Sequence, residues 1–270
     1  MYFAPEVRAA LDELGYRGYW MGYFAARSAP LGPVPTEVVT ATFFNFSPAR
    51  VAKALPAAWE IAPPADALRV RADTAVAALR RYGVDALDVA TAADLLAKAA
   101  KTTPVAGRPL FAANAALPWP TTPLDTLWHA ATLLREHRGD GHIAALVAAG
   151  ISGRESNVLH CAAGAVRSDY IKRTRDYDDN EWQQCCAGLA ERGLIGSDLT
   201  LTAAGRELKE HIESVTNAVS LSAFDALDDA EIQTLFAALT PITRAVIAGG
   251  DLPEVTPMGL RRDELDNSEA

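Results

Sequence analysis

The densest group of residues that could do chemistry lies within ten positions, in the segment LLREHRGDGH at 133–142. This segment holds two histidines, His137 and His142, with Asp140 between them. Imidazole titrates near neutral pH, and a carboxylate that orients it is a common arrangement in acid–base catalysis. If the protein is an enzyme, we therefore expect His137, Asp140 and His142 to be its catalytic residues.

The same segment is also suited to holding an anionic or hydroxylated ligand. Arg138 lies inside it, and Trp128 and His129 precede it on the same predicted helix. We expect the two glycines to break this helix into 126–137 and 142–149, which would turn Asp140 back towards the first piece. The alternative is a polar connection between two helices, in which Asp140 only caps the second one.

A metal site is not expected in this segment. The spacing His137-x-x-Asp140-x-His142 offers three ligands, but no fourth histidine or cysteine lies nearby in the sequence. A structural zinc site of tetrahedral geometry needs four protein ligands. The sequence indicates no particular cofactor.

A second candidate site is aromatic. Tyr16, Tyr19, Trp20, Tyr23 and Phe24 lie on neighbouring faces of one predicted helix, with Arg27 after them and Asn45 further along the chain. Tyrosines keep a polar end when their rings are buried, and arginines are seldom buried without an anion. We therefore predict a pocket for a flat, polar aromatic ligand. The ligand-binding residues expected from both segments are Tyr23, Arg27, Asn45, Trp128, His129 and Arg138.

Helical periodicity dominates the elements that must position these residues. We predict helices at 5–14, 16–29, 36–44, 48–55, 66–82, 92–100, 126–137, 142–149, 155–163, 168–175, 181–192, 203–218 and 228–247. Asp178 or Asp179 is the expected N-cap of the helix at 181–192. The stretch 103–123 is rich in proline and is expected to be an irregular connector.

The sequence also indicates a chain built from two copies of one unit. Residues 79–84, LRRYGV, fall on residues 189–194, LAERGL, and Thr91 then falls on Thr202. Self-similarity at half the chain length indicates a duplicated architecture. We predict a mainly α protein with duplicated winged-helix units that form a single-chain pseudo-dimer with vestigial wings. The predicted halves are 1–117 and 118–270.

Composition narrows the possible functions. The chain of 270 residues carries 25 Lys and Arg against 34 Asp and Glu, a net charge of -9. DNA binding relies on Lys and Arg that neutralise phosphates, so this balance argues against it. No apolar stretch reaches the roughly 20 residues of a membrane helix, and three cysteines make no disulfide framework. We expect a cytoplasmic protein without a membrane partner; its oligomeric state stays open.

Residues Asp179–Leu239 resemble the multiple-antibiotic-resistance regulator (MarR) family of winged helices. The resemblance rests on the helix ending in Gly193-Leu194-Ile195, the step LTAAG at 201–205, and a long helix followed by Leu227, Glu231 and Leu235. It implies that the helix at 181–192 faces the major groove of DNA and that a basic hairpin grips the minor groove. Here the hairpin is replaced by GSDLT at 196–200, without a cation, and the helix begins with DDNE at 178–181. Specific DNA binding is therefore not the leading expectation.

The whole chain also resembles an actinobacterial helix-turn-helix family of unassigned function. The segments that carry this resemblance are GYWMGYFAARSAPLGPV, ATFFNFSP, LFAANAALPWP and WHAATLLREHRGDGH. Our leading hypothesis is a small-molecule binding protein derived from a winged-helix regulator, with an aromatic ligand between its halves. The alternatives are an enzyme that uses the HRGDGH segment for acid–base chemistry and a DNA-binding transcription regulator.

Overall fold

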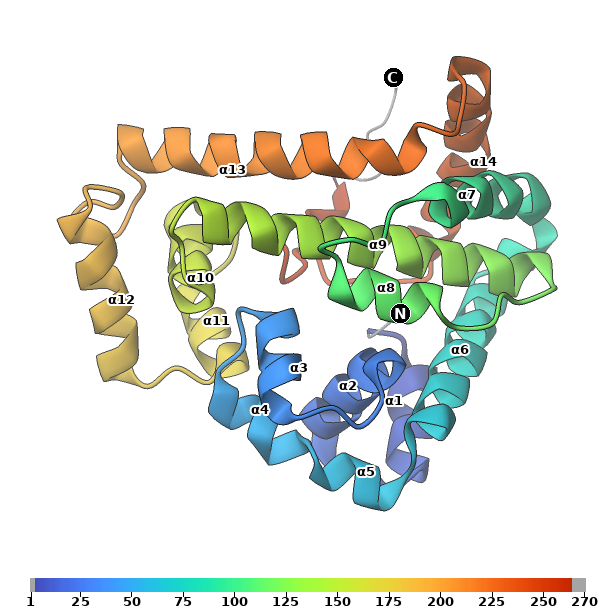
Figure 1. The fold of residues 1–270 in the computed structure, drawn as a ribbon, viewed down its shortest axis with the longest axis horizontal. Coiled ribbons are helices and arrows are strands. Elements are labelled where there is room, and N and C mark those ends of the chain that lie inside the picture. The colour runs from blue at the N-terminus through green and yellow to red at the C-terminus, as the bar shows by residue number, and fades with distance from the viewer. Residues whose placement is uncertain (1–2, 264–270) are drawn as a thin grey trace. The chain divides into compact units, whose positions relative to one another are not determined.

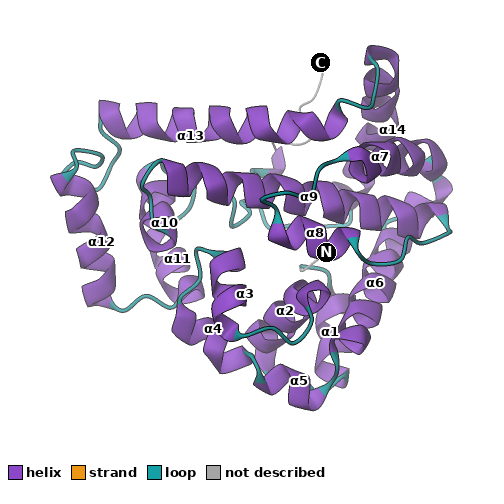
Figure 2. Ribbon diagram, viewed as in Figure 1, coloured by secondary structure: helices purple, strands orange, loops and turns teal. Residues whose placement is uncertain are grey.

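The computed structural model describes residues 3–263, and in this range the chain is mainly helical, with no strand (Figures 1 and 2). It divides into two compact units that interleave along the chain. Within the described residues, unit 1 comprises 3–35, 53–140 and 220–253, and unit 2 comprises 36–52, 141–219 and 254–263. These units do not follow the predicted halves 1–117 and 118–270, because each unit takes segments from both halves.

Unit 1 is built from helices that lie near the start, the middle and the end of the sequence. They are α1 (Pro5–Glu13), α2 (Gly18–Ser28), η1 (Ala29–Leu31), α5 (Ala57–Ile61), α6 (Pro64–Arg81), η2 (Val84–Ala86), α7 (Val89–Thr102), α8 (Pro109–Ala115), the first part of α9 (Pro123–Ala148), η3 (Ser222–Phe224) and α14 (Asp229–Ala248). One core cluster packs α7 and α9 with α14, through residues such as Leu96, Leu127 and Leu235. Helix α8 lies inside the stretch that we expected to be irregular, so that expectation was wrong.

Unit 2 has its own core. Its helices are α3 (Thr36–Phe43), α4 (Pro48–Ala54, up to Ala52), the end of α9, α10 (Gly153–Ala162), α11 (Ser168–Arg175), α12 (Asp179–Glu191) and α13 (Ala203–Leu221, up to Val219). The apolar side chains at its centre include Val158, Ile171 and Leu189, one from each of α10, α11 and α12. The three short helices therefore form one packed group, and α11 has the bounds that the sequence predicts.

A glycine explains how the chain returns from α12 into α13. Thr202 caps α13 by accepting a hydrogen bond from the backbone N–H of Gly205 at 3.0 Å. A Cβ atom on Gly205 would lie 2.0 Å from the carbonyl oxygen of Leu194, so only glycine fits. In the LTAAG segment at 201–205, Thr202 therefore caps α13, and Gly205 allows the backbone of α13 to pass close to that of Leu194.

The connection between α12 and α13 contains a very short hairpin. Ile195 and Leu201 form one isolated antiparallel bridge, and residues 196–200 make the turn between them. Leu199 adopts a left-handed conformation in this turn, with φ of 59°. Residues 196–200 therefore form only a tight turn.

Helix α9 corrects the most important local prediction. It runs without interruption from Pro123 to Ala148, where two helices separated by a glycine turn were expected (Figure 1). Glycine inside a helix costs about 1 kcal/mol relative to alanine, which packing of the helix can offset. Gly139 and Gly141 therefore continue α9, and Asp140 does not cap a second helix.

None of the helices within residues 3–263 is long and apolar enough to cross a lipid bilayer.

Candidate functional site

A stripe of buried polar residues runs along α9 in unit 1. We name it the α9 polar stripe; its members, all at most 8% exposed, are His129, Thr132, Glu136, His137 and Asp140. Residues three or four apart share one face of a helix, so four of them follow one line along α9. Buried polar groups need partners, and other helices of unit 1 supply most of them.

Glu136 receives two arginines. The Nε and Nη2 atoms of Arg27 donate to its two carboxylate oxygens at 3.3 and 3.1 Å, and Arg135 donates to the same carboxylate. Burial alone would raise the pKa of Glu136. The two guanidinium groups have the larger combined effect and lower this pKa to about 2. Tyr23 accepts a hydrogen bond from Arg27 at 3.1 Å. The structure therefore brings Tyr23 and Arg27 to α9, where Arg27 contacts Glu136. Glu136 is not among the ligand-binding residues expected from the sequence.

Asp140 caps a different helix from the one considered above. Its Oδ2 atom accepts the backbone N–H groups of Leu110 and Phe111, at 3.0 and 2.9 Å, at the start of α8. Burial raises the pKa of this carboxyl to about 6, although both N–H groups counteract the rise. Asp140 therefore positions α8.

His137 packs its ring against Phe111 with centroids 5.3 Å apart, and its backbone carbonyl accepts from Arg108. Burial and the charge of Arg108 lower its pKa to about 4, so the ring is neutral at pH 7. His142 belongs to unit 2, where its Nδ1 atom lies 3.0 Å from the hydroxyl of Thr216. The three candidate catalytic residues thus have separate partners.

The remaining predicted ligand-binding residues are spread over the fold. Trp128 packs partly buried in the core of unit 1, and His129 lies edge-on to Trp119 with centroids 4.8 Å apart. Asn45 lies in unit 2, where its carbonyl accepts from Asn157 at 2.9 Å, and Arg138 is exposed.

Unit 2 contains two helices joined by a tight turn. Residues 176–178 separate α11 from α12, and Asp176 adopts a left-handed conformation with φ of 60°. Asp178 caps α12 by accepting the N–H of Glu181 at 2.7 Å, which confirms one of the two predicted caps. A turn of three to four residues between two helices defines the helix-turn-helix arrangement.

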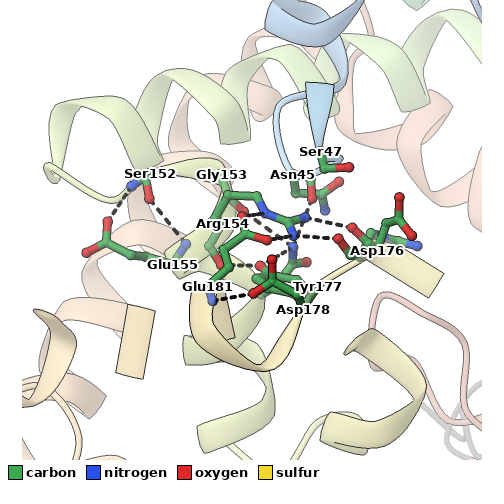
Figure 3. Close-up of polar contacts among 12 residues, drawn as sticks. Asn45, Ser47, Ser152, Gly153, Arg154, Glu155, Asp176, Tyr177, Asp178 and Glu181 are labelled. Atoms are coloured by element: carbon green, nitrogen blue, oxygen red, sulfur yellow. Dashed lines mark hydrogen bonds and ion pairs between the residues drawn. The ribbon is translucent and has the colours of Figure 1, made fainter. Parts of the chain in front are cut away.

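Arg154 from α10 holds this turn in place (Figure 3). It donates to both carboxylate oxygens of Glu181 at 2.6 and 2.7 Å, and to the carbonyls of Arg175 and Asp176 at 2.8 and 3.3 Å. Its guanidinium carbon also lies 3.4 Å from the ring centroid of Tyr177. One side chain therefore links the end of α11, the turn and the start of α12.

The two faces of α12 differ in character. Trp182, Cys186 and Leu189 point into the core of unit 2. We call the exposed residues of α12 its outer face; they are Asp179, Asn180, Gln183, Gln184, Ala187, Ala190 and Glu191. This outer face is rich in amide side chains and has no cation.

The acidic residues at the start of α12 all have structural partners. Asp178 caps the helix, Asp179 pairs with Lys172, and Glu181 pairs with Arg154. The acidic sequence DDNE thus serves partly to assemble the turn. Pairing with Lys172 and Arg154 offsets part of the negative charge at the start of α12.

Sequence reasoning missed Arg154, Arg71 and Asn114, although two signals were available. Arg154 lies in the first turn of α10, where a cation opposes the helix dipole and so needs another reason to be there. Arg71 lies four residues from both Ala67 and Ala75, which are buried on the inner face of α6. Asn114 gave no comparable signal.

The fold and the geometry of α11 and α12 define a helix-turn-helix protein. A family model described as a helix-turn-helix family matches residues 1–253, so the chain belongs to this helix-turn-helix family. No curated protein and no solved structure matches the chain.

Proposed function

We propose that the protein is a DNA-binding regulator and that unit 2 places the outer face of α12 in the major groove. The observation that carries this proposal is the helix-turn-helix held together by Arg154, with Asn180, Gln183 and Gln184 exposed on its second helix. Asparagine and glutamine side chains can form paired hydrogen bonds with adenine in the major groove. The likeness of residues Asp179–Leu239 to MarR-type winged helices supports the same placement.

Electrostatic attraction contributes little to this binding. The reduced wing carries Asp198 and no cation, and Arg167 and Lys172 on the α11 side are paired with Asp169 and Asp179. Arg173 is exposed and forms no ion pair within residues 3–263. Few phosphate contacts mean weak non-specific affinity, so discrimination rests on base contacts.

The test starts from selection of duplexes out of a random-sequence pool, followed by fluorescence anisotropy with the enriched duplex. The double variant Gln183→Ala/Gln184→Ala should lose affinity for that duplex, because each paired contact with a base is worth about 1–3 kcal/mol. Gln233→Ala, an exposed glutamine of α14 in unit 1, is the matched control. A pool that yields no enriched sequence would contradict the proposal.

Small-molecule binding is the second candidate, and a specific cavity favours it. A pocket of about 540 Å³ lies within unit 2, lined by Val158, Cys161, Val166, Trp182, Cys186 and Leu199 among others. This volume falls in the range of ligand sites, about 300–1,000 Å³. Burial raises the pKa of the Cys161 thiol to about 12, so this thiol is uncharged at pH 7. The ion pair of Arg167 and Asp169 also lines the pocket, which therefore suits a flat ligand that is apolar over most of its surface and polar at one edge.

This pocket differs from the predicted site between the halves, which stays a prediction. Titration calorimetry with indole, a neutral aromatic probe, tests the pocket directly. Binding by the wild type that disappears in Cys161→Phe, which fills the space, would support ligand binding here. No heat of binding up to the solubility limit of indole would count against it.

We also propose that the duplication is real, on the evidence of two local structures. The helices α6 and α12 both end before a left-handed glycine, Gly83 with φ of 77° and Gly193 with φ of 68°. A buried residue follows each, Val84 and Leu194. After the glycines, the alignment of the two copies must be shifted. Thr202 caps α13 and Asp88 caps α7, so Thr202 corresponds to Asp88 and not to Thr91.

A further inference from the structure

Helix α14 of unit 1 carries an exposed aromatic side chain although its inner side is packed. Leu235 and Ile242 are buried in the core of the unit, and Ile232 and Leu239 pack against that core. Phe236, the next residue after Leu235, is 63% exposed. One exposed apolar side chain is common on protein surfaces and does not by itself define an interface. The residues that surround Phe236 therefore decide what this surface can do.

These residues form a stripe along α14. Residues three or four apart share one face of a helix, and six residues follow this spacing. We name them the α14 outer stripe: Asp229, Gln233, Phe236, Ala237, Thr240 and Arg244. Five of the six are exposed, and Thr240 is half-buried. The hydroxyl of Thr240 donates to the carbonyl of Phe236 at 2.8 Å, so it keeps a partner when water is excluded from the stripe.

The α14 outer stripe is complementary to itself when it is turned end to end. Its centre lies between Phe236 and Ala237, Gln233 and Thr240 are equally far from this centre, and so are Asp229 and Arg244. In a symmetric pair of identical chains, a residue that contacts a second position is contacted by that position in return.

Two α14 helices packed antiparallel about this centre would therefore join three kinds of contact. The ring of Phe236 would lie against the small side chain of Ala237 of the second copy. Gln233 and Thr240 would form a neutral pair that adds little. At both ends Asp229 of one copy would meet Arg244 of the other, so opposite charges would face each other.

A parallel pair would lack this complementarity. It would place Asp229 beside Asp229 of the second copy and Arg244 beside Arg244. Like charges that face each other across an interface are repulsive and disfavour the arrangement. The charges at the two ends of the stripe therefore select the antiparallel direction.

We propose that unit 1 forms a symmetric homodimer in which α14 packs antiparallel against α14 of a second copy, centred between Phe236 and Ala237. Aromatic side chains are enriched in the buried centre of interfaces, and Phe236 takes this place here. Helix α14 has 20 residues and is about 30 Å long. One pair of such helices makes a small interface, below about 1,200 Å², of the size found in weak complexes. This dimer is separate from the helix-turn-helix of unit 2 and does not depend on DNA binding.

Sedimentation equilibrium of the full chain, from about 1 μM to about 1 mM, tests the association. We expect the mass of the wild type to rise from monomer to dimer over this range. Phe236→Glu places a charge at the centre of the interface and should stay monomeric throughout. Leu221→Glu makes the same kind of change at a residue of unit 1 that is 65% exposed and lies outside the stripe, so it should dimerise like the wild type. A wild type that stays monomeric, or a dimer that Phe236→Glu does not weaken, would overturn the proposal.

Exchange of the end charges tests the antiparallel direction. Asp229→Lys and Arg244→Glu each place like charges opposite each other twice in the dimer, so each should raise Kd by about tenfold. The double variant Asp229→Lys/Arg244→Glu restores opposite charges and should return Kd to that of the wild type. Circular dichroism checks that every variant keeps its helices. A double variant that dimerises as weakly as the single ones would refute the antiparallel pairing.

Discussion

Arg154 and Glu181 form a two-pronged ion pair that joins the first turn of α10 to the first turn of α12. The two N–O distances are 2.6 and 2.7 Å, and the side chains are 16% and 34% exposed. A bidentate ion pair fixes the relative orientation of its two side chains as well as attracting them. The angle between the two helices of the helix-turn-helix therefore depends on a residue outside it.

The first prediction concerns this pair. Arg154→Ala removes four hydrogen bonds and leaves two carbonyls of the turn without these donors, so it should lower the free energy of unfolding by about 2–4 kcal/mol. Urea unfolding measures the loss, and amide hydrogen exchange should locate it in α11 and α12. Arg173→Ala, on the exposed side of α11, serves as the control. A loss below about 0.5 kcal/mol would show that the turn holds without Arg154.

The second prediction tests the continuity of α9. A Cβ atom on Gly139 would lie 3.7 Å from Oε2 of Glu136, which is an ordinary contact, and the backbone is helical. Gly139→Ala should therefore stabilise the protein by about 0.5–1 kcal/mol. If a glycine turn existed here, the same change would destabilise it. Thermal unfolding of the two proteins distinguishes the outcomes by the sign of the change in Tm.

The third prediction concerns pH. Burial lowers the pKa of His129, His137 and His160 to about 4, from an ordinary value of 6.5. Between these values the unfolded chain binds more protons than the folded one, so stability is complete above pH 6.5 and falls as the pH drops towards 4. Asp140 acts in the opposite direction, since its pKa is raised to about 6, but three histidines outweigh one carboxyl.

Each histidine should contribute on the order of 1–3 kcal/mol to this loss. Urea unfolding at a series of pH values measures it. His160→Gln should flatten the dependence, whereas His211→Gln, at an exposed position of α13, should leave it unchanged. Stability that is constant from pH 7 to 4.5 would show that the histidines are not buried in the neutral form.

The fourth prediction concerns the reduced wing. Ser197 is exposed in a turn without cations, so Ser197→Arg should add one phosphate contact. Affinity for duplex DNA should then rise, and the slope of log K against log salt should steepen by about 1. Gln233→Arg adds the same charge in unit 1 and should have little effect. Equal steepening by both variants would mean that net charge alone, and not the wing, governs the change.

Local signals in the sequence were enough to determine most of the helices. The bounds of α11 agree with the prediction, Asp178 caps α12 as one of two expected residues, and Gly193 ends that helix. These features depend on residues within one or two turns of each other. Caps, glycines of positive φ and the spacing of apolar residues act at that range, so a sequence can reveal them.

Local signals in the sequence predicted only part of the candidate site. The sequence places Tyr23 one turn before Arg27, and the two side chains are in contact, but the ionic partner of Arg27 is Glu136, more than a hundred residues away. Asp140 was expected beside its own helix and instead serves α8. A carboxylate buried by one helix can be satisfied by any backbone N–H that the fold brings near, and the sequence does not say which.

The sequence alone determined that this protein is helical and where most of its helices begin and end. The tertiary structure decided that α9 continues through Gly139 and Gly141, that Arg154 organises the helix-turn-helix, and that the buried Arg71 donates to the carbonyl of Ala26 and the amide of Asn114. The physical reason is the separation along the sequence of the residues that interact. Helix caps and periodicity act between neighbours, whereas burial and charge pairing depend on contacts between segments that are distant in the chain, and these contacts offset local preferences of about 1 kcal/mol.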